Sequence, residues 1–156
     1  MEIVNKRQWK INKILHYILR ERFTKKIEFN FPKNIDRWNL INEIIFFKNF
    51  SSYLEIGCDN DDAFSKIKLN DKIGVDPHSG GNFRGTSDLF FQQNKKKFDC
   101  IFIDGLHEYD QVNKDILNSL DSLNENGIIL LHDCLPQSMN QQAVPRFQWV
   151  WNGDVW

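Results

Sequence analysis

Long apolar stretches are missing from this 156-residue sequence. It has no run of 18 apolar residues, and its first 13 residues mix charged and apolar side chains. A membrane-spanning helix needs about 20 mainly apolar residues, and a secretory signal needs an apolar core of about 7 to 15 residues. The sequence therefore predicts neither a membrane span nor a signal peptide, and we expect a cytoplasmic protein.

Cysteine is scarce as well. The three cysteines, Cys58, Cys100 and Cys134, form an odd number and contain no CxxC pair. A disulfide framework uses cysteines in pairs, and a structural zinc site needs four closely spaced ligands. The sequence argues against both, so we expect reduced thiols.

The remaining composition is ordinary for a globular protein, with 41% hydrophobic and 26% charged residues. The length fits one domain over 1–156, with a helical N-terminal segment (1–50) and a core (51–156). Charge is uneven, because 1–50 carry 11 Lys and Arg against 5 Asp and Glu, whereas 51–156 carry 9 against 16. A basic segment can bind nucleic acid or an acidic membrane. Here the basic residues alternate with apolar ones at helical spacing, which favours the solvated faces of packed helices and no nucleic-acid partner.

The N-terminal segment carries two helical patterns. Apolar residues recur at helical steps from Ile11 to Leu19 and predict an amphipathic helix with these residues packed inward, while His16 is left as a surface residue. Asp36 can cap a second helix. Its inward residues are Trp38, Ile41, Ile44 and Ile45.

From Ser51 onward, short apolar runs alternate with helical patterns. The runs predict strands at 53–57, 72–77, 82–86, 98–105 and 128–131. The helices are expected at 63–69, at 87–93 and from 109 to near 126–127. Nearly continuous apolar strands alternating with helices are typical of a parallel sheet covered on both faces. We therefore predict a Rossmann-like, doubly wound α/β fold with about five strands.

Polar residues follow each predicted strand, where ligands bind in such sheets. Gly57 permits a tight first turn, and Asp76 lies 19 residues further on, a spacing that suits an acid binding two ribose hydroxyls. The alternative is that Asp76 only caps the turn before Pro77. The first loop lacks GxGxxG and carries Asp59, Asp61 and Asp62. These carboxylates would repel a diphosphate and suit a positively charged nucleoside.

The strand-end motifs, in this order, resemble the class I S-adenosylmethionine-dependent methyltransferases. The similar segments are Leu54 to Gly57, Val75-Asp76, Phe98 to His107 and Asn126 to Asp133. The resemblance runs from about Tyr53 to Trp156, and the wording FDCIFIDGLHEYDQVNKDI and GIILLHDCLP looks most like a small bacterial branch often found near polysaccharide genes.

The resemblance implies an S-adenosylmethionine site at these strand ends. Gly57 would approach the methionine part, Asp76 the ribose, and Ser87 with Asp88 the adenine edge. Glu55 and Asp59 complete the expected cofactor-binding set. Asp59 and Asp61 depart from the family, whose loop usually has further glycines there.

Methyl transfer requires alignment of the acceptor and removal of its proton. His107 and His132 are the candidate bases, because imidazole titrates near neutral pH, and Asp104 and Asp133 accompany them. Either histidine could instead have a structural role. Asp104 and Asp133 close strands expected to be adjacent, so by resemblance to metal-dependent O-methyltransferases they could share Mg²⁺. The alternative is that Asp104 orients the loop or the acceptor.

We therefore expect methyl transfer to a hydroxyl of a small molecule or a sugar. The alternatives are a truncated cofactor-binding domain without turnover, a nicotinamide-dependent oxidoreductase, and a nucleic-acid-binding module. The family is expected to add an antiparallel strand pair after the fifth strand, whereas this chain ends in a tail with Phe147, Trp149, Trp151 and Trp156. We expect this tail or a second copy of the chain to cover the open edge of the fifth strand, and turnover to be weak.

Overall fold

The computed structural model describes residues 5–19, 26–30 and 32–155. Their contacts separate into two compact units. The terminal unit comprises the described residues within 1–31, 107–109 and 133–156, and the sheet unit comprises 32–106 and 110–132. Trp156, one of the tail aromatics, lies outside the described residues. The organisation of 1–156 as one domain stays a prediction.

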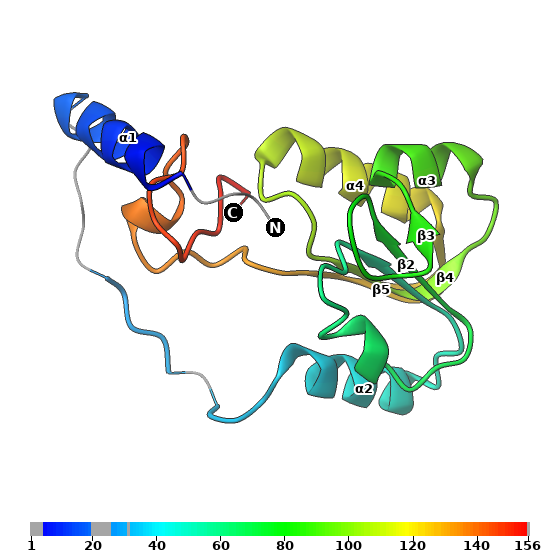
Figure 1. Cartoon of the computed structure of the whole chain (residues 1–156). Coiled ribbons are helices and arrows are strands. Elements are labelled where there is room, and N and C mark those ends of the chain that lie inside the picture. Colours follow the sequence, from blue (N-terminus) through cyan, green and yellow to red (C-terminus); the bar gives the residue numbers. More distant parts are fainter. Residues whose placement is uncertain (1–4, 20–25, 31, 156) are drawn as a thin grey trace. The chain divides into compact units, whose positions relative to one another are not determined.

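The sheet unit holds five parallel strands (Figure 1). They are β1 (Tyr53–Ile56), β2 (Lys72–Asp76), β3 (Phe83–Arg84), β4 (Phe98–Ile103) and β5 (Leu123–Leu131). Their order across the sheet is β3-β2-β1-β4-β5. This confirms the predicted Rossmann-like fold and puts the carboxyl ends of all five strands at one edge of the sheet.

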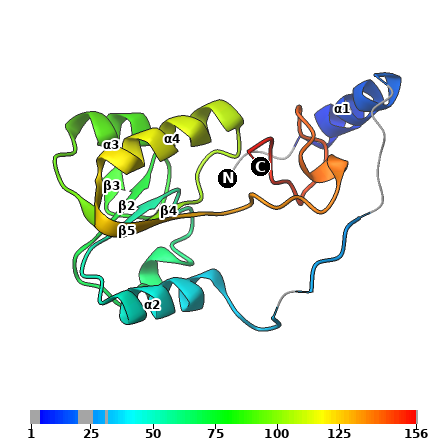
Figure 2. The same ribbon diagram turned by 180° about the vertical axis from the view of Figure 1, so that it is seen from behind.

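Helices cover both faces of the sheet (Figures 1 and 2). One face is covered by α2 (Arg37–Lys48), and the other by α3 (Ser87–Gln93) and α4 (Tyr109–Asp121). Tyr53 packs with Ile41 and Ile45 of α2, whereas its neighbour Leu54 packs in a cluster with Phe90 of α3. Successive residues of a strand point to opposite faces, so β1 is apolar throughout because both of its faces are buried.

Two of the helices expected in the core differ from the prediction. The segment 63–69 forms only a 3₁₀ turn, Phe64–Lys66, after which Ile67 is extended. The ammonium group of Lys72 donates to the carbonyls of Phe64 and Ile67, at 2.7 and 2.9 Å, and so satisfies groups that a longer helix would have used. Helix α4 ends at Asp121, not near 126–127.

The Asn126-Gly127 pair belongs to β5 and does not end a helix. Asn126 has φ of +65°, and the pairing of β4 with β5 shifts register between Phe98 and Cys100. A left-handed residue is equally suited to a helix end and to an irregularity in a strand. The Asn126-Gly127 pair therefore does indicate a left-handed residue, but this residue lies at an irregularity of β5 and not at the end of a helix.

The terminal unit contains the first helix, α1 (Lys6–Ile18), as predicted, but the expected inward face is wrong. Ile11, Ile14 and Ile18 are 51%, 58% and 67% exposed, whereas Asn12 and His16 are buried. The Asn12 amide donates to the Arg146 carbonyl at 2.7 Å, and His16 Nε2 lies 2.9 Å from the Pro145 carbonyl oxygen. The helix docks through polar groups because the irregular chain at 145–146 offers main-chain acceptors. His16 is therefore not a surface residue.

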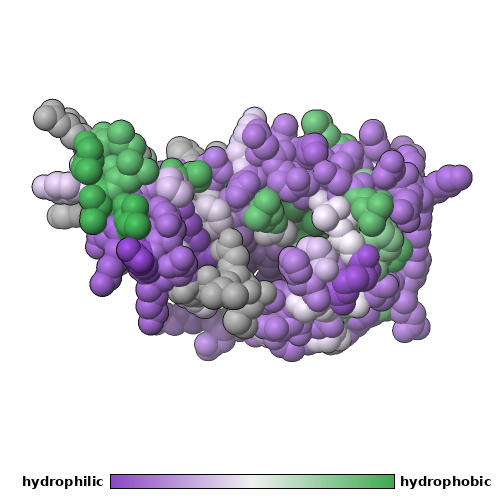
Figure 3. Space-filling view, turned by 45° about the horizontal axis from the view of Figure 1, so that its top comes forward, coloured by the Kyte–Doolittle hydropathy of each residue, from purple (hydrophilic) through white to green (hydrophobic). Residues whose placement is uncertain are grey.

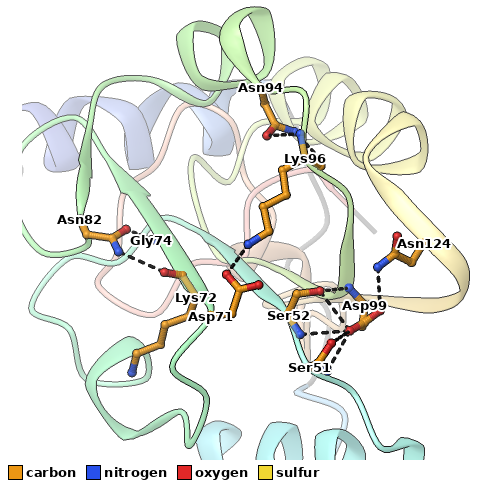
Figure 4. A network of polar contacts seen from close by, with 10 residues as sticks. All are labelled: Ser51, Ser52, Asp71, Lys72, Gly74, Asn82, Asn94, Lys96, Asp99 and Asn124. Atoms are coloured by element: carbon orange, nitrogen blue, oxygen red, sulfur yellow. Dashed lines mark hydrogen bonds and ion pairs between the residues drawn. The ribbon is translucent and has the colours of Figure 1, made fainter.

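The amino ends of the central strands are joined by a polar network around Asp99 (Figure 4). Its Oδ2 accepts from the backbone N–H and the hydroxyl of both Ser51 and Ser52, at 2.8 to 3.0 Å, and its Oδ1 accepts from the Asn124 amide at 2.7 Å. Burial opposes ionisation of Asp99, but these donors hold its pKa at about 2. The carboxylate thus ties the entry to β1, the start of β4 and β5 together.

The sheet has β5 as one of its two edge strands, because within the described residues β5 pairs with β4 alone. Among residues 132–155 the structure has no further strand and forms a single 3₁₀ turn, Met139–Gln141. No helix in the described parts of the chain is long and apolar enough to cross a membrane.

Candidate active site

The predicted site residues of the sheet unit lie along the carboxyl edge of the sheet. Gly57 directly follows β1, Asp76 ends β2, Asp104 follows β4, and His132 follows β5. This edge is the usual position of a ligand site in a doubly wound sheet. The geometry at each strand end decides what the edge can bind.

Gly57 is required by the close approach of two strand ends. Its φ is +87°, and a Cβ at this position would lie 2.3 Å from the carbonyl oxygen of Asp104. A residue with a side chain would be strained there and would collide with backbone. Gly57 therefore has a structural reason in addition to the predicted contact with a cofactor.

The first loop has two aspartates in left-handed backbone conformations. Asp59 and Asp61 have φ of +44° and +63°, in the left-handed region that Asp tolerates better than most residues. The Asp61 carboxylate accepts from the N–H of Gly81 at 2.6 Å. The departure from the family's sequence pattern therefore places aspartates at two positions whose φ would favour glycine, and it adds negative charge.

Asp76 links the loops that follow β1 and β2. Its Oδ2 accepts from the N–H groups of Cys58 and Asp59 at 3.1 and 3.0 Å, and its Oδ1 accepts from those of His78 and Ser79 at 2.8 and 2.9 Å. Burial by itself would raise the pKa of Asp76, but these four bonds lower it. A carboxylate has about four acceptor positions, so a ribose hydroxyl would have to share or displace one of them.

Glu55 lies beneath this edge, inside the core. Its side chain is 2% exposed, and its Oε2 accepts from the Tyr53 hydroxyl at 2.6 Å. Burial raises the pKa of Glu55 to about 7, although the Tyr53 bond works in the opposite direction. Its predicted contact with a cofactor stays a prediction.

Asp104 and His132 come together as a pair at the ends of β4 and β5. His132 Nδ1 lies 2.9 Å from Asp104 Oδ1, and Arg37 Nε, from the start of α2, lies 3.8 Å from Asp104 Oδ2. The His132 ring also meets Phe102 edge-on, with ring centroids 6.0 Å apart. The imidazole thus lies against a carboxylate on one side and an aromatic ring on another.

The other two predicted catalytic residues meet in the terminal unit. His107 Nε2 lies 3.7 Å from Asp133 Oδ2, and the Asn152 amide donates to Asp133 Oδ1 at 3.2 Å. Trp151 meets the His107 ring edge-on, with centroids 6.2 Å apart. A second His–Asp pair therefore exists, held by the aromatic tail.

Ser87 and Asp88, the predicted adenine contacts, start α3 and face α4. The Gln111 amide donates to Ser87 Oγ at 3.2 Å, and Lys114 Nζ lies 2.9 Å from Asp88 Oδ2. The hydrogen bond from Lys114 lowers the pKa of Asp88. Their role toward a cofactor stays a prediction.

The surroundings of Asp104 do not fit the predicted Mg²⁺. Mg²⁺ prefers oxygen ligands, whereas nitrogen groups of His132 and Arg37 face the Asp104 carboxylate. Among the residues that the structure describes, no group of three or more His, Cys, Asp or Glu could hold a metal ion. The described residues around Asp104 therefore do not form the predicted Mg²⁺ site.

Sequence reasoning missed Arg37 and Asn152. The sequence did contain an indication for Arg37, because only residues 49–52 separate α2 from β1. So short a link makes the helix run back along the strand, which brings the start of α2 to the carboxyl end of β1. Asn152 lies in an irregular segment and had no such signal.

The comparison with known proteins agrees with this geometry. A family model described as a methyltransferase domain matches residues 55–134, about half of the chain. No curated protein and no solved structure matches the chain. The matched residues contain the end of β1 and all of β2 to β5, with the strand ends at Gly57, Asp76, Asp104 and His132. Members of the family generally bind S-adenosylmethionine. The chain therefore belongs to this family of class I methyltransferase domains.

Proposed function

We propose that the sheet unit binds S-adenosylmethionine at its carboxyl edge and methylates a hydroxyl of a small molecule or a sugar. The observation that carries the proposal is the pairing of His132 with Asp104 at 2.9 Å, beside the loop that begins at Gly57. The pair offers a base and its orienting carboxylate at the edge where the family binds its cofactor.

The bound cofactor supplies a methyl group already activated by a positively charged sulfur. The chain then has to align the acceptor and remove its proton. His132 can take the hydroxyl proton on Nε2, since Nδ1 is the nitrogen that faces Asp104. The Asp104 carboxylate stabilises the resulting imidazolium, as a carboxylate does in other His–Asp pairs.

The charge of the first loop supports a cationic ligand over a dinucleotide. Asp59, Asp61 and Asp62 follow β1 where a dinucleotide-binding loop presents glycines and N–H groups to phosphate. Their carboxylates would repel a diphosphate and attract a sulfonium. This favours methyl transfer over the oxidoreductase alternative.

Calorimetry with S-adenosylmethionine, S-adenosylhomocysteine and NAD tests cofactor binding. We expect both adenosyl ligands to bind and NAD not to bind. If Asp76 binds the ribose, Asp76→Ala should weaken binding of S-adenosylmethionine about tenfold or more. A 2′-deoxy analogue should then bind wild type more weakly than S-adenosylmethionine does, whereas the variant should bind the two ligands equally well. If Asp76 acts only by linking the loops, the analogue loses the same factor in both proteins.

Transfer of tritiated methyl groups to a panel of mono- and oligosaccharides tests the reaction. Asp104→Asn and His132→Gln should lower turnover far more than cofactor affinity, whereas His78→Gln, an exposed control, should change neither. Cofactor binding without transfer to any acceptor would favour the alternative of a binding domain without turnover. Activity that is lost on chelation and restored by Mg²⁺ would contradict the metal-free form of the proposal.

A further inference from the structure

We propose that the exposed face of α1 docks the terminal unit on an anionic lipid surface. The surface consists of two adjoining stripes of α1, one apolar and one cationic, together with exposed residues of the C-terminal tail. The inference is independent of the proposed methyl transfer, because every residue it uses lies in the terminal unit.

The apolar stripe is the face that the sequence predicted to be inward. Its members share one side of the helix, three or four residues apart, and each is between 41% and 67% exposed: Ile11, Ile14, Leu15, Ile18 and Leu19. Figure 3 shows these hydrophobic residues gathered over α1. Contiguous exposed apolar residues of this kind mark sites of protein or membrane interaction.

The cationic stripe runs beside the apolar one. Lys6, Lys10 and Lys13 succeed one another at helical steps and are exposed, and Arg7 lies within the apolar side. Residues 6–18 contain no Asp or Glu. The third stripe, with Asn12 and His16, is buried against the tail. Docking of α1 on its own unit therefore leaves both outer stripes available.

This arrangement fits an interfacial helix. Such a helix lies in the plane of the membrane with its apolar side among the acyl chains, while lysines reach the headgroups by their long stems. The tail adds Trp149, which is 65% exposed and packs near Trp9 with ring centroids 6.4 Å apart, and Val150, which is 60% exposed. Trp is favoured at the membrane–water interface.

Charge decides between a lipid surface and a second copy of the chain. Two copies that met through α1 would bring together two helices that each carry four cationic side chains and no acidic one. Their repulsion opposes a dimer through this face, whereas anionic headgroups complement it. The observations therefore favour the lipid.

Co-sedimentation of the full chain with vesicles tests the proposal. We expect binding to vesicles of phosphatidylcholine with phosphatidylglycerol, weaker binding at high salt, and much weaker binding to phosphatidylcholine alone. The double variant Ile14→Ser/Ile18→Ser should lose about tenfold or more in affinity, and Lys10→Gln should lose about fivefold. The control Phe46→Ser/Phe47→Ser removes two aromatic side chains of α2 that are 76% and 78% exposed, and it should bind as wild type.

Three results would overturn the proposal. Wild type could fail to bind anionic vesicles, or bind both vesicle types equally and independently of Lys10. Light scattering could instead reveal a dimer that Ile14→Ser/Ile18→Ser dissociates, which would assign the stripe to a second copy. The double variant could lower the melting temperature of the protein by several degrees while vesicle binding is absent, which would make the stripe part of an intramolecular contact.

Discussion

Burial of Glu55 beside Tyr53 couples its protonation to folding. Its pKa is raised from about 4.5 to about 7, so the folded state binds the proton more tightly than the unfolded state. The contribution of Glu55 to the free energy of unfolding is therefore fully present below pH 4.5, and it is lost as the pH rises through about 7. Glu55→Gln should remove this loss and make the variant more stable than wild type at pH 8 by about 3 kcal/mol.

Urea unfolding at pH 5 and pH 8 checks this expectation. The matched control is Glu43→Gln, which replaces an exposed glutamate of α2 and should leave the pH profile unchanged. If the free energies of unfolding of wild type and Glu55→Gln change in parallel between pH 5 and pH 8, Glu55 is ionised in both the folded and the unfolded state.

Asp99 should have the opposite pH dependence and a larger structural role. Its low pKa means that it stabilises the fold above about pH 4 and that this contribution is lost as the pH falls toward 2. Asp99→Ala removes an acceptor shared by Ser51, Ser52 and Asn124. It should lower the free energy of unfolding by about 2 to 4 kcal/mol at pH 7. Thermal melting would measure this against Asp62→Ala, an exposed control; a change no larger than that of the control would contradict it.

Single residues also mark the limit of sequence reasoning about the site. Gly57, Asp76, Asp104 and His132 could be placed at one edge because parallel strands end together. The four N–H bonds of Asp76 could not be foreseen, because they depend on how two loops fold over one carboxylate. His16 looked like a surface residue because nothing in its neighbours in sequence indicates a main-chain acceptor 129 residues away.

At the scale of elements, the contact between Gly57 and Asp104 should govern how the ends of β1 and β4 fit together. Gly57→Ala adds a Cβ 2.3 Å from backbone at φ of +87°, so both strain and overlap oppose it. The substitution should lower the free energy of unfolding by about 3 kcal/mol or more. Gly105→Ala is the matched control, because its Cβ would lie 3.4 Å from an Ile56 methyl group. Circular dichroism melts that fall equally for both variants would contradict this account.

Helices and strands with strong periodicity were predictable from the sequence, whereas the segments that they pack against were not. The first four strands and α3 lie where the sequence pattern predicts them, whereas β5 begins at Leu123, five residues before the predicted start. Thr86 caps α3 by accepting from the N–H of Leu89. Periodicity identified α1 as a helix but could not tell which of its stripes would pack, since that depends on the distant segment around 145–146. The end of α4 was misplaced because Asn-Gly suits two different structures.

For the whole molecule, the edge position of β5 in the sheet predicts association. Edge strands present unpaired N–H and C=O groups that pair readily with another chain. We expect light scattering to detect a dimer. The variant Leu131→Lys, at a half-exposed position of β5, should weaken the affinity of this dimer by about tenfold, because lysines on edge strands oppose strand pairing. Leu117→Lys, on the exposed side of α4, serves as the control. A stable monomer whose β5 amides exchange slowly would point instead to cover by the chain's own tail.

The position of β1 in the middle of the sheet also has a consequence for synthesis on the ribosome. Tyr53 of β1 pairs with Cys100 of β4 on one side and with Lys72 of β2 on the other. Because the chain emerges from its N-terminus, β1 and β2 are available long before β4. Until residues 98–103 emerge, one edge of β1 therefore has unpaired N–H and C=O groups beside apolar side chains that are not yet covered. We expect chaperones to bind the nascent chain during this interval.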